Sequence, residues 1–152
     1  MTKTRWLHVG LVCLALAAVA YVFLQGGRWE SYNAAGVDAY QRGDYADAEK
    51  QWSDGLKEAE EFGPEDPRLA SSLNILAELY RAQDRYTEAE PLYKRALAIR
   101  EKALGPEHPD VAQRQENYAA LLRKIGRDVE ASEMEVRAKA IRAKHGRENP
   151  VQ

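Results

Sequence analysis

The chain has 152 residues, of which 45% are apolar, and its 22 Lys plus Arg and 24 Asp plus Glu give a formal net charge of −2. This length suits one domain of ordinary size, and a single cysteine excludes both an intrachain disulfide and a multi-cysteine metal site. Nucleic-acid-binding domains usually carry a strong basic excess. Because this sequence has none, we expect no nucleic-acid partner.

An apolar run over residues 7–24 contains no Lys, Arg, Asp or Glu. As a helix it would span roughly 27 Å, which is close to the thickness of the hydrocarbon layer of a bilayer. Trp6 and Trp29 flank the run, and we expect each indole to lie at a membrane interface. The sequence therefore predicts an N-terminal transmembrane anchor over residues 1–27, in contact with the lipid bilayer through residues 7–24.

The basic residues predict the orientation of this anchor. Lys3 and Arg5 precede the apolar run, so the positive-inside rule places the N-terminus in the cytoplasm and the rest of the chain outside it. We expect a single-pass protein of a bacterial cytoplasmic membrane, with a periplasmic or extracytoplasmic domain. A cleaved secretory signal is the alternative, because Ala18-Val19-Ala20 satisfies the A-x-A cleavage pattern. Gly26 and Gly27 are expected to break or hinge the helix.

The rest of the chain contains an internal repeat. One loop occurs three times, beginning at Gly63, Gly105 and Gly146, so that the copies are spaced by 42 and 41 residues. Its glycine supplies the positive φ that ends a helix. The residue before the last proline of each loop is expected to cap the next helix, with that proline in the first turn. These N-cap residues are Asp66, His108 and Asn149, which gives His108 a structural role.

Apolar and small residues recur at helical spacing between the loops. In the second repeat they form two stripes: Leu69, Leu73, Leu76, Ala77 and Tyr80, then Ala89, Leu92, Tyr93, Ala96 and Leu97. The second helix is expected to begin with a capping box of Thr87 and Glu90, with Pro91 at the end of its first turn. We predict three pairs of antiparallel helices, over about 30–70, 71–112 and 113–152, which must stack to bury their apolar faces.

The stretch from Leu73 to Ile99 resembles a tetratricopeptide repeat (TPR) of the 42-residue type found in kinesin light chains and many bacterial proteins. Small residues of that pattern fall at Ala77, Ala89 and Ala96. Armadillo-type repeats are the rival, which this small-residue spacing disfavours. The resemblance implies an all-α TPR superhelical solenoid of three helix-turn-helix repeats over residues 28–152, and the transmembrane helix predicted from the apolar run would precede it.

The third repeat departs from the family pattern. It has Asp128 and Glu135 where aromatic residues are usual, and a narrow apolar stripe runs along residues 128–145. We therefore expect its last helix to be less buried and to cap the array with a polar outer side.

The resemblance also implies that the first helix of each repeat lines a concave face that binds protein partners. The positions it places on this face are Asn33, Val37, Tyr40, Asn74, Glu78, Arg81, Glu116, Arg123 and Lys124. The histidines at 8, 108 and 145 lack the spacing of metal ligands, and no phosphate-binding glycine loop or catalytic constellation is present. We expect no enzyme activity, no catalytic or metal site and no cofactor.

Charge is graded along the repeats. Residues 30–70 have a net charge of −7, residues 71–112 of −1 and residues 113–152 of +3. This polarity would favour head-to-tail self-association. We predict a membrane-anchored scaffold or assembly factor on the non-cytoplasmic face of the membrane. The alternative is a constitutive small accessory subunit of a larger membrane complex, its helix packed through the small-residue stretch of residues 15–20.

Overall fold

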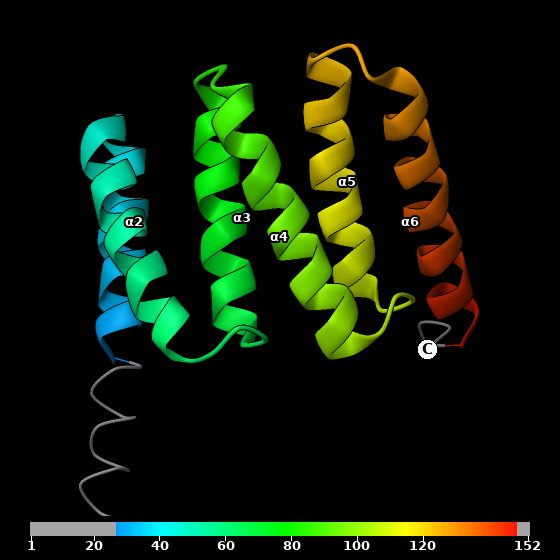
Figure 1. Ribbon diagram of the computed structural model, residues 1–152, viewed down its shortest axis with the longest axis horizontal. Coiled ribbons are helices and arrows are strands. Elements are labelled where there is room, and N and C mark those ends of the chain that lie inside the picture. The colour runs from blue at the N-terminus through cyan, green and yellow to red at the C-terminus, as the bar shows by residue number, and fades with distance from the viewer. Residues whose placement is uncertain (1–26, 149–152) are drawn as a thin grey trace, which may run out of the picture.

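The computed structural model describes residues 27–148, and this part of the chain is entirely helical apart from its turns (Figure 1). Residues 27–41 are helical and are followed by five helices: α2 (Tyr45–Glu61), α3 (Pro67–Ala82), α4 (Tyr86–Leu104), α5 (Pro109–Lys124) and α6 (Asp128–Glu148). Helix 27–41 with α2, α3 with α4, and α5 with α6 form the three predicted pairs. The borders at residues 70 and 112 lie inside α3 and α5.

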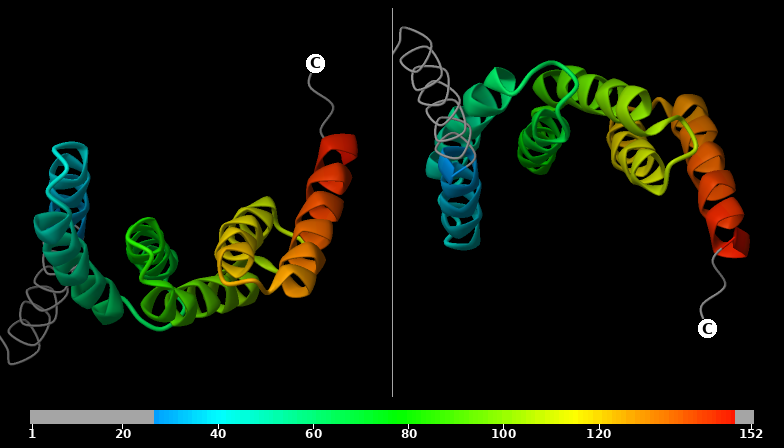
Figure 2. Two further views of the ribbon diagram at one scale, coloured as in Figure 1. Left: turned by 90° about the horizontal axis from the view of Figure 1, so that it is seen from above. Right: turned by 90° about the horizontal axis from the view of Figure 1, so that it is seen from below.

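The helix pairs stack into an arc (Figure 2). Each pair packs against the next, through α2 on α3 and α4 on α5. Helix 27–41, α3 and α5 lie on the inner side of the arc, α2 and α4 lie on the outer side, and α6 forms its end (Figure 2). The fold is thus a TPR-like solenoid with a concave side lined by first helices.

Small residues allow the close helix packing that the repeat pattern predicts. Ala77, Ala89, Ala96 and Ala138 are completely buried. In the first repeat, a Cβ atom added at Gly36 would lie 2.3 Å from Nε1 of Trp52. The indole therefore lies directly against the backbone of helix 27–41.

The loop chemistry is confirmed in two of the three copies. Asp66 and His108 are N-caps whose side chains accept hydrogen bonds from the backbone N–H of the second residue beyond them. Gly63 and Gly105 have positive φ. The third copy was predicted wrongly, because α6 continues through Gly146 to Glu148 without a positive φ at the glycine. Asn149 lies outside the described residues.

The start of α4 also differs from the prediction. Arg85 is the N-cap and makes no side-chain cap hydrogen bond, so the capping box of Thr87 and Glu90 is wrong. The carboxylate of Glu90 instead accepts hydrogen bonds from Tyr118 and Arg127 of the next repeat. Pro91 lies inside the helix beyond its first turn.

A glutamate–arginine contact joins successive repeats at equivalent positions. Glu49 of α2 accepts hydrogen bonds from Arg85 at 2.5 Å and from the Tyr80 hydroxyl at 3.1 Å. One repeat later, Glu90 of α4 accepts from Arg127 at 2.5 Å and from the Tyr118 hydroxyl at 3.0 Å. We call these contacts the inter-repeat clamps. They fix each second helix to the following pair.

The predicted membrane segment, residues 7–24, lies outside the described residues. Within residues 27–148, no helix is both long enough and apolar enough to cross a membrane. Gly27, expected to break or hinge the helix, is itself helical. Trp29 was assigned wrongly to the membrane interface: its Nε1 donates a hydrogen bond of 2.8 Å to Ser72 Oγ, and its ring packs on the core around Leu69 and Ala70. The indole belongs to the helical domain.

Candidate protein-binding surface

A pocket of about 310 Å³ lies between the first two repeats. Most of its walls come from helix 27–41 and α3, two of the helices that line the concave side. The lining residues are Val37, Tyr40, Trp52, Ile75, Glu78, Leu79, Arg81 and Ala82. We call this hollow the concave pocket.

Aromatic rings form one side of the concave pocket. The Tyr40 ring lies 5.8 Å from the Trp52 ring and 5.3 Å from the Tyr45 ring, measured between centroids. Trp52 is only 6% exposed, whereas Val37 and Tyr40 are 45% and 40% exposed. Two apolar side chains on the concave side thus remain accessible beside a fixed, buried indole. This combination suits an apolar side chain of a partner.

An ion pair forms the polar part of the pocket wall. Nη2 of Arg81 lies 2.6 Å from Oε2 of Glu78, and Nε of Arg81 donates to the Tyr93 hydroxyl at 3.3 Å. The hydrogen bond to Glu78 raises the pKa of the Arg81 guanidinium above its ordinary value. Burial raises the pKa of Tyr93, so this hydroxyl keeps its proton at neutral pH. Glu78 and Arg81 can offer oriented hydrogen bonds next to the apolar surface, whereas the buried Tyr93 only holds Arg81 in place.

The structure brings four of the nine predicted residues together, because Val37, Tyr40, Glu78 and Arg81 all line the concave pocket. Asn33 and Asn74 are turned inward instead. The side-chain nitrogen of Asn33 is buried, and Asn74 is 6% exposed and accepts a hydrogen bond from Asn117 at 3.2 Å.

The three predicted residues of α5 are separate from the concave pocket. Glu116 forms an ion pair of 2.7 Å with Arg142 of α6, and Arg123 forms one of 2.7 Å with Glu135. Lys124 is exposed at the end of α5. The side chains of Glu116 and Arg123 therefore fasten α5 to α6.

The sequence did not indicate that Trp52 contributes to the concave pocket, nor that Arg114 is partly buried. Trp52 belongs to α2, a second helix, and reaches the pocket because Gly36 leaves room for its ring. Arg114 of α5 is partly buried, its Nε has no hydrogen-bond partner in the described structure, and burial lowers the pKa of its guanidinium. Because that nitrogen is buried and Arg114 does not line the concave pocket, a partner cannot reach the donor. In the sequence, Arg114 is one charged helix residue among many.

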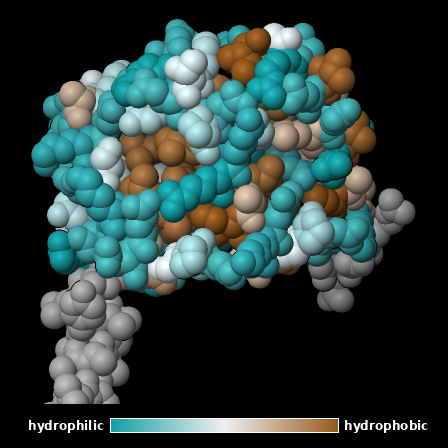
Figure 3. All heavy atoms as spheres, in the orientation of Figure 1, coloured by the Kyte–Doolittle hydropathy of each residue, from teal (hydrophilic) through white to brown (hydrophobic). Residues whose placement is uncertain are grey.

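The outer face of the arc is largely hydrophilic, with hydrophobic residues visible between the helices and near the α6 end (Figure 3). In the part of the chain that the structure describes, no group of three or more His, Cys, Asp or Glu residues could hold a metal ion.

The tetratricopeptide-repeat family model matches residues 28–102 and, in a second overlapping match, residues 68–144. The chain belongs to the tetratricopeptide-repeat family. The matches together run from helix 27–41 into α6, and so include every residue of the concave pocket. Among curated proteins, none matches this TPR chain.

Solved structures show the same fold. BtubC (BKLC) from P. vanneervenii is 28% identical to this TPR protein, with a TM-score of 0.74, over 88% of this chain and 54% of that one. A Podosopora anserina kinesin light chain with nearly identical TPR-like repeats is 28% identical, with a TM-score of 0.69, over 78% of this chain and 56% of that one. A single-substitution variant of that kinesin light chain is 27% identical, with a TM-score of 0.69, over 80% and 57%. The TPR chain thus spans about half the length of these structures.

Proposed function

We propose that this TPR protein is a scaffold that binds a segment of a partner protein along its concave side. The observation that carries the proposal is the concave pocket, in which exposed Val37 and Tyr40 lie beside the buried Trp52. TPR domains typically bind protein partners, and binding would be the whole mechanism. The protein would have no enzyme activity of its own.

The lining of the concave pocket defines the partner chemistry. An apolar side chain fits against Tyr40 and Trp52, and an adjacent backbone or polar group can reach Glu78 or Arg81 at the wall. Aromatic residues and arginine are enriched at positions that dominate binding energy. We therefore expect a partner segment with one large apolar anchor flanked by polar groups.

Site-specific photocrosslinking in cells that express the full chain tests this function. A photoreactive residue at Val37 should give an adduct with a distinct partner, and Tyr40→Ala in the same chain should abolish it. Leu104 is a matched control, because it is also an exposed apolar residue, 38% accessible, but lies at the end of α4. Equal adducts from both positions, or an adduct at Val37 that survives Tyr40→Ala, would contradict a role for the concave pocket.

We also propose that residues 7–24 anchor the protein in a bacterial cytoplasmic membrane, with the TPR domain on the non-cytoplasmic face. The apolar run and the preceding Lys3 and Arg5 support this placement. A reporter fused after Gln152 should then be active outside the cytoplasm, and activity only in the cytoplasm would refute the topology. A mature N-terminus at Tyr21 would instead support a cleaved signal.

The small residues of the apolar run favour a second candidate function, a constitutive accessory subunit of a larger membrane complex. Ala15, Ala17, Ala18 and Ala20 could form a helix-packing face. Replacing these four by leucine should abolish assembly if the segment packs against other spans. A simple tether would tolerate the change.

A further inference from the structure

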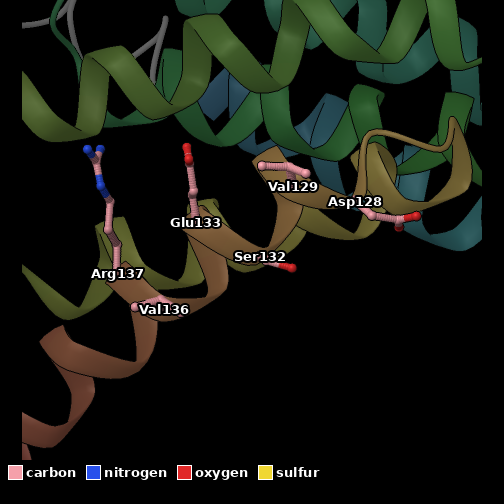
Figure 4. Close-up of a pocket in the computed structure, with 6 residues that line it drawn as sticks. All are labelled: Asp128, Val129, Ser132, Glu133, Val136 and Arg137. Atoms are coloured by element: carbon pink, nitrogen blue, oxygen red, sulfur yellow. The ribbon is translucent and has the colours of Figure 1, made fainter.

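The side of α6 that faces away from α5 is not the polar outer side that the sequence predicted, because an uncovered apolar stripe runs along it. Val129 and Val136 are 74% and 68% exposed, the highest values among the large hydrophobic residues of the described part. They lie seven residues apart, two helical turns, and Ala140, also exposed, extends the stripe. Six residues, all of α6, border this open surface (Figure 4): Asp128, Val129, Ser132, Glu133, Val136 and Arg137.

The charges of α6 are divided along the helix. Between residues 128 and 135 every charged residue is acidic, and between residues 137 and 147 every charged residue is basic. Some of them fasten α6 to the rest of the repeat, as Glu135 does with Arg123 and Arg142 does with Glu116. An antiparallel copy of this helix would place its basic half against the acidic half of the first.

Three charged residues on or beside the exposed stripe have no partner within residues 27–148. They are Glu133, Arg137 and Lys139, and all three are exposed. Glu133 lies one turn before Val136, whereas Arg137 and Lys139 follow it. A twofold axis close to Val136 would bring Glu133 of each copy close to Arg137 of the other, because both lie on the same flank of the stripe. The face is therefore self-complementary in charge and in apolar contact.

A further repeat stacked on α6 is a poorer occupant. The counterpart in α6 of the clamp glutamates, Glu49 and Glu90, is Ser132, which follows the buried Ala131 as Glu90 follows Ala89. In head-to-tail association the incoming first repeat would also need a basic residue where Arg85 and Arg127 lie. It has Asp44, the N-cap of α2. Ser132 and Asp44 cannot form the ion pair that joins the repeats inside the chain.

We propose that the exposed face of α6 is the contact surface for a second copy of this chain, paired α6 to α6 in an antiparallel, twofold-symmetric dimer. In this isologous contact Val136 meets its own counterpart, and Glu133 meets Arg137 across the axis. The exposed rows lie four residues apart along α6, which favours the helix crossing of about −50° formed by such ridges. Contact through one helix per copy gives a small interface, so we expect a weak and reversible dimer.

Charge reversal in the full chain tests the pairing, with two differently tagged copies co-expressed and the second tag measured after purification through the first in mild detergent. Glu133→Lys alone, or Arg137→Glu with Lys139→Glu, places like charges across the axis and should weaken self-association by about tenfold or more. Each variant should fail to pair with itself. A Glu133→Lys chain mixed with an Arg137→Glu/Lys139→Glu chain should pair again, because every contact across the axis is then between opposite charges.

Glu61→Lys is the matched control, since Glu61 is an exposed acid of α2 at the other end of the array. It should leave association unchanged. Loss of association in Glu61→Lys, no loss in the α6 variants, no recovery in the mixture, or no self-association of the original chain would each overturn the proposal. Glu133, Arg137 and Lys139 do not line the concave pocket. The α6 variants should therefore leave partner crosslinking through Val37 unchanged, so that the two proposals can fail separately.

Discussion

Replacing Glu90 with glutamine removes the carboxylate that joins α4 to the third repeat. In the folded chain, hydrogen bonds from Lys94, Arg127 and Tyr118 lower the pKa of Glu90 from 4.5 to about 2. At about 1.36 kcal/mol per unit of pKa, a shift of this size sets an upper limit of roughly 3.4 kcal/mol on the stabilisation. The Glu90 side chain is 22% exposed, so solvent screening reduces this, and we expect Glu90→Gln to cost about 1.5–2 kcal/mol.

Urea unfolding of the full chain, followed by the helical circular dichroism signal, measures this loss. A carboxylate with a lowered pKa stabilises the fold above its unfolded pKa of about 4.5, and the stabilisation disappears as the pH falls towards about 2. The difference between the original chain and Glu90→Gln should therefore be full at pH 7 and should shrink below pH 4.5. Glu61→Gln, at an exposed acid on α2, is the control and should change little. A difference below about 0.5 kcal/mol at pH 7, or one independent of pH, would show that the ionised Glu90 carboxylate does not stabilise the fold through these hydrogen bonds.

Further predictions concern the stability effects of substitutions at four positions. Gly36→Ala should cost about 2–3 kcal/mol in urea unfolding, because the new Cβ would lie 2.3 Å from the buried Trp52 ring. Gly146 lies inside α6, and a Cβ added there would meet nothing within 4 Å. Gly146→Ala should therefore stabilise the fold by about 0.5–1 kcal/mol. Asp84 has a φ of 58°, so Asp84→Val should cost about 1–2 kcal/mol whereas Asp84→Gly should not, and equal losses would contradict a left-handed turn. Trp29→Phe should cost about 1 kcal/mol by removing the hydrogen bond to Ser72. An unchanged unfolding midpoint would contradict the assignment of this indole to the helical domain.

Features of the fold that depend on local chemistry could be predicted from the sequence. The N-caps Asp66 and His108 precede prolines, and the turn glycines and packing alanines recur at a fixed period. Each signal lies within a few residues of the structure it determines. The stacked helix pairs therefore followed from the repeat, and their TPR-like arrangement from the family resemblance.

Features that depend on distant partners could not be predicted in the same way. Glu90 looked like part of a capping box, but Arg127 and Tyr118 of the next repeat bind its carboxylate. Trp29 follows an apolar run, yet Ser72, 43 residues away, accepts its hydrogen bond. The inward turn of Asn33 and Asn74 likewise depends on neighbouring helices, as does the reach of Trp52 into the concave pocket.

The concave pocket is the proposed place where a partner binds, and the affinity of the crosslinked partner for matched variants measures its contribution. The dissociation constant should rise at least about tenfold for Val37→Asp and for Tyr40→Ala, because each removes apolar contact at the centre of the pocket. Leu104→Asp, at the end of α4, should leave it unchanged. Equal affinities for all of these variants would show that the partner does not bind in the concave pocket.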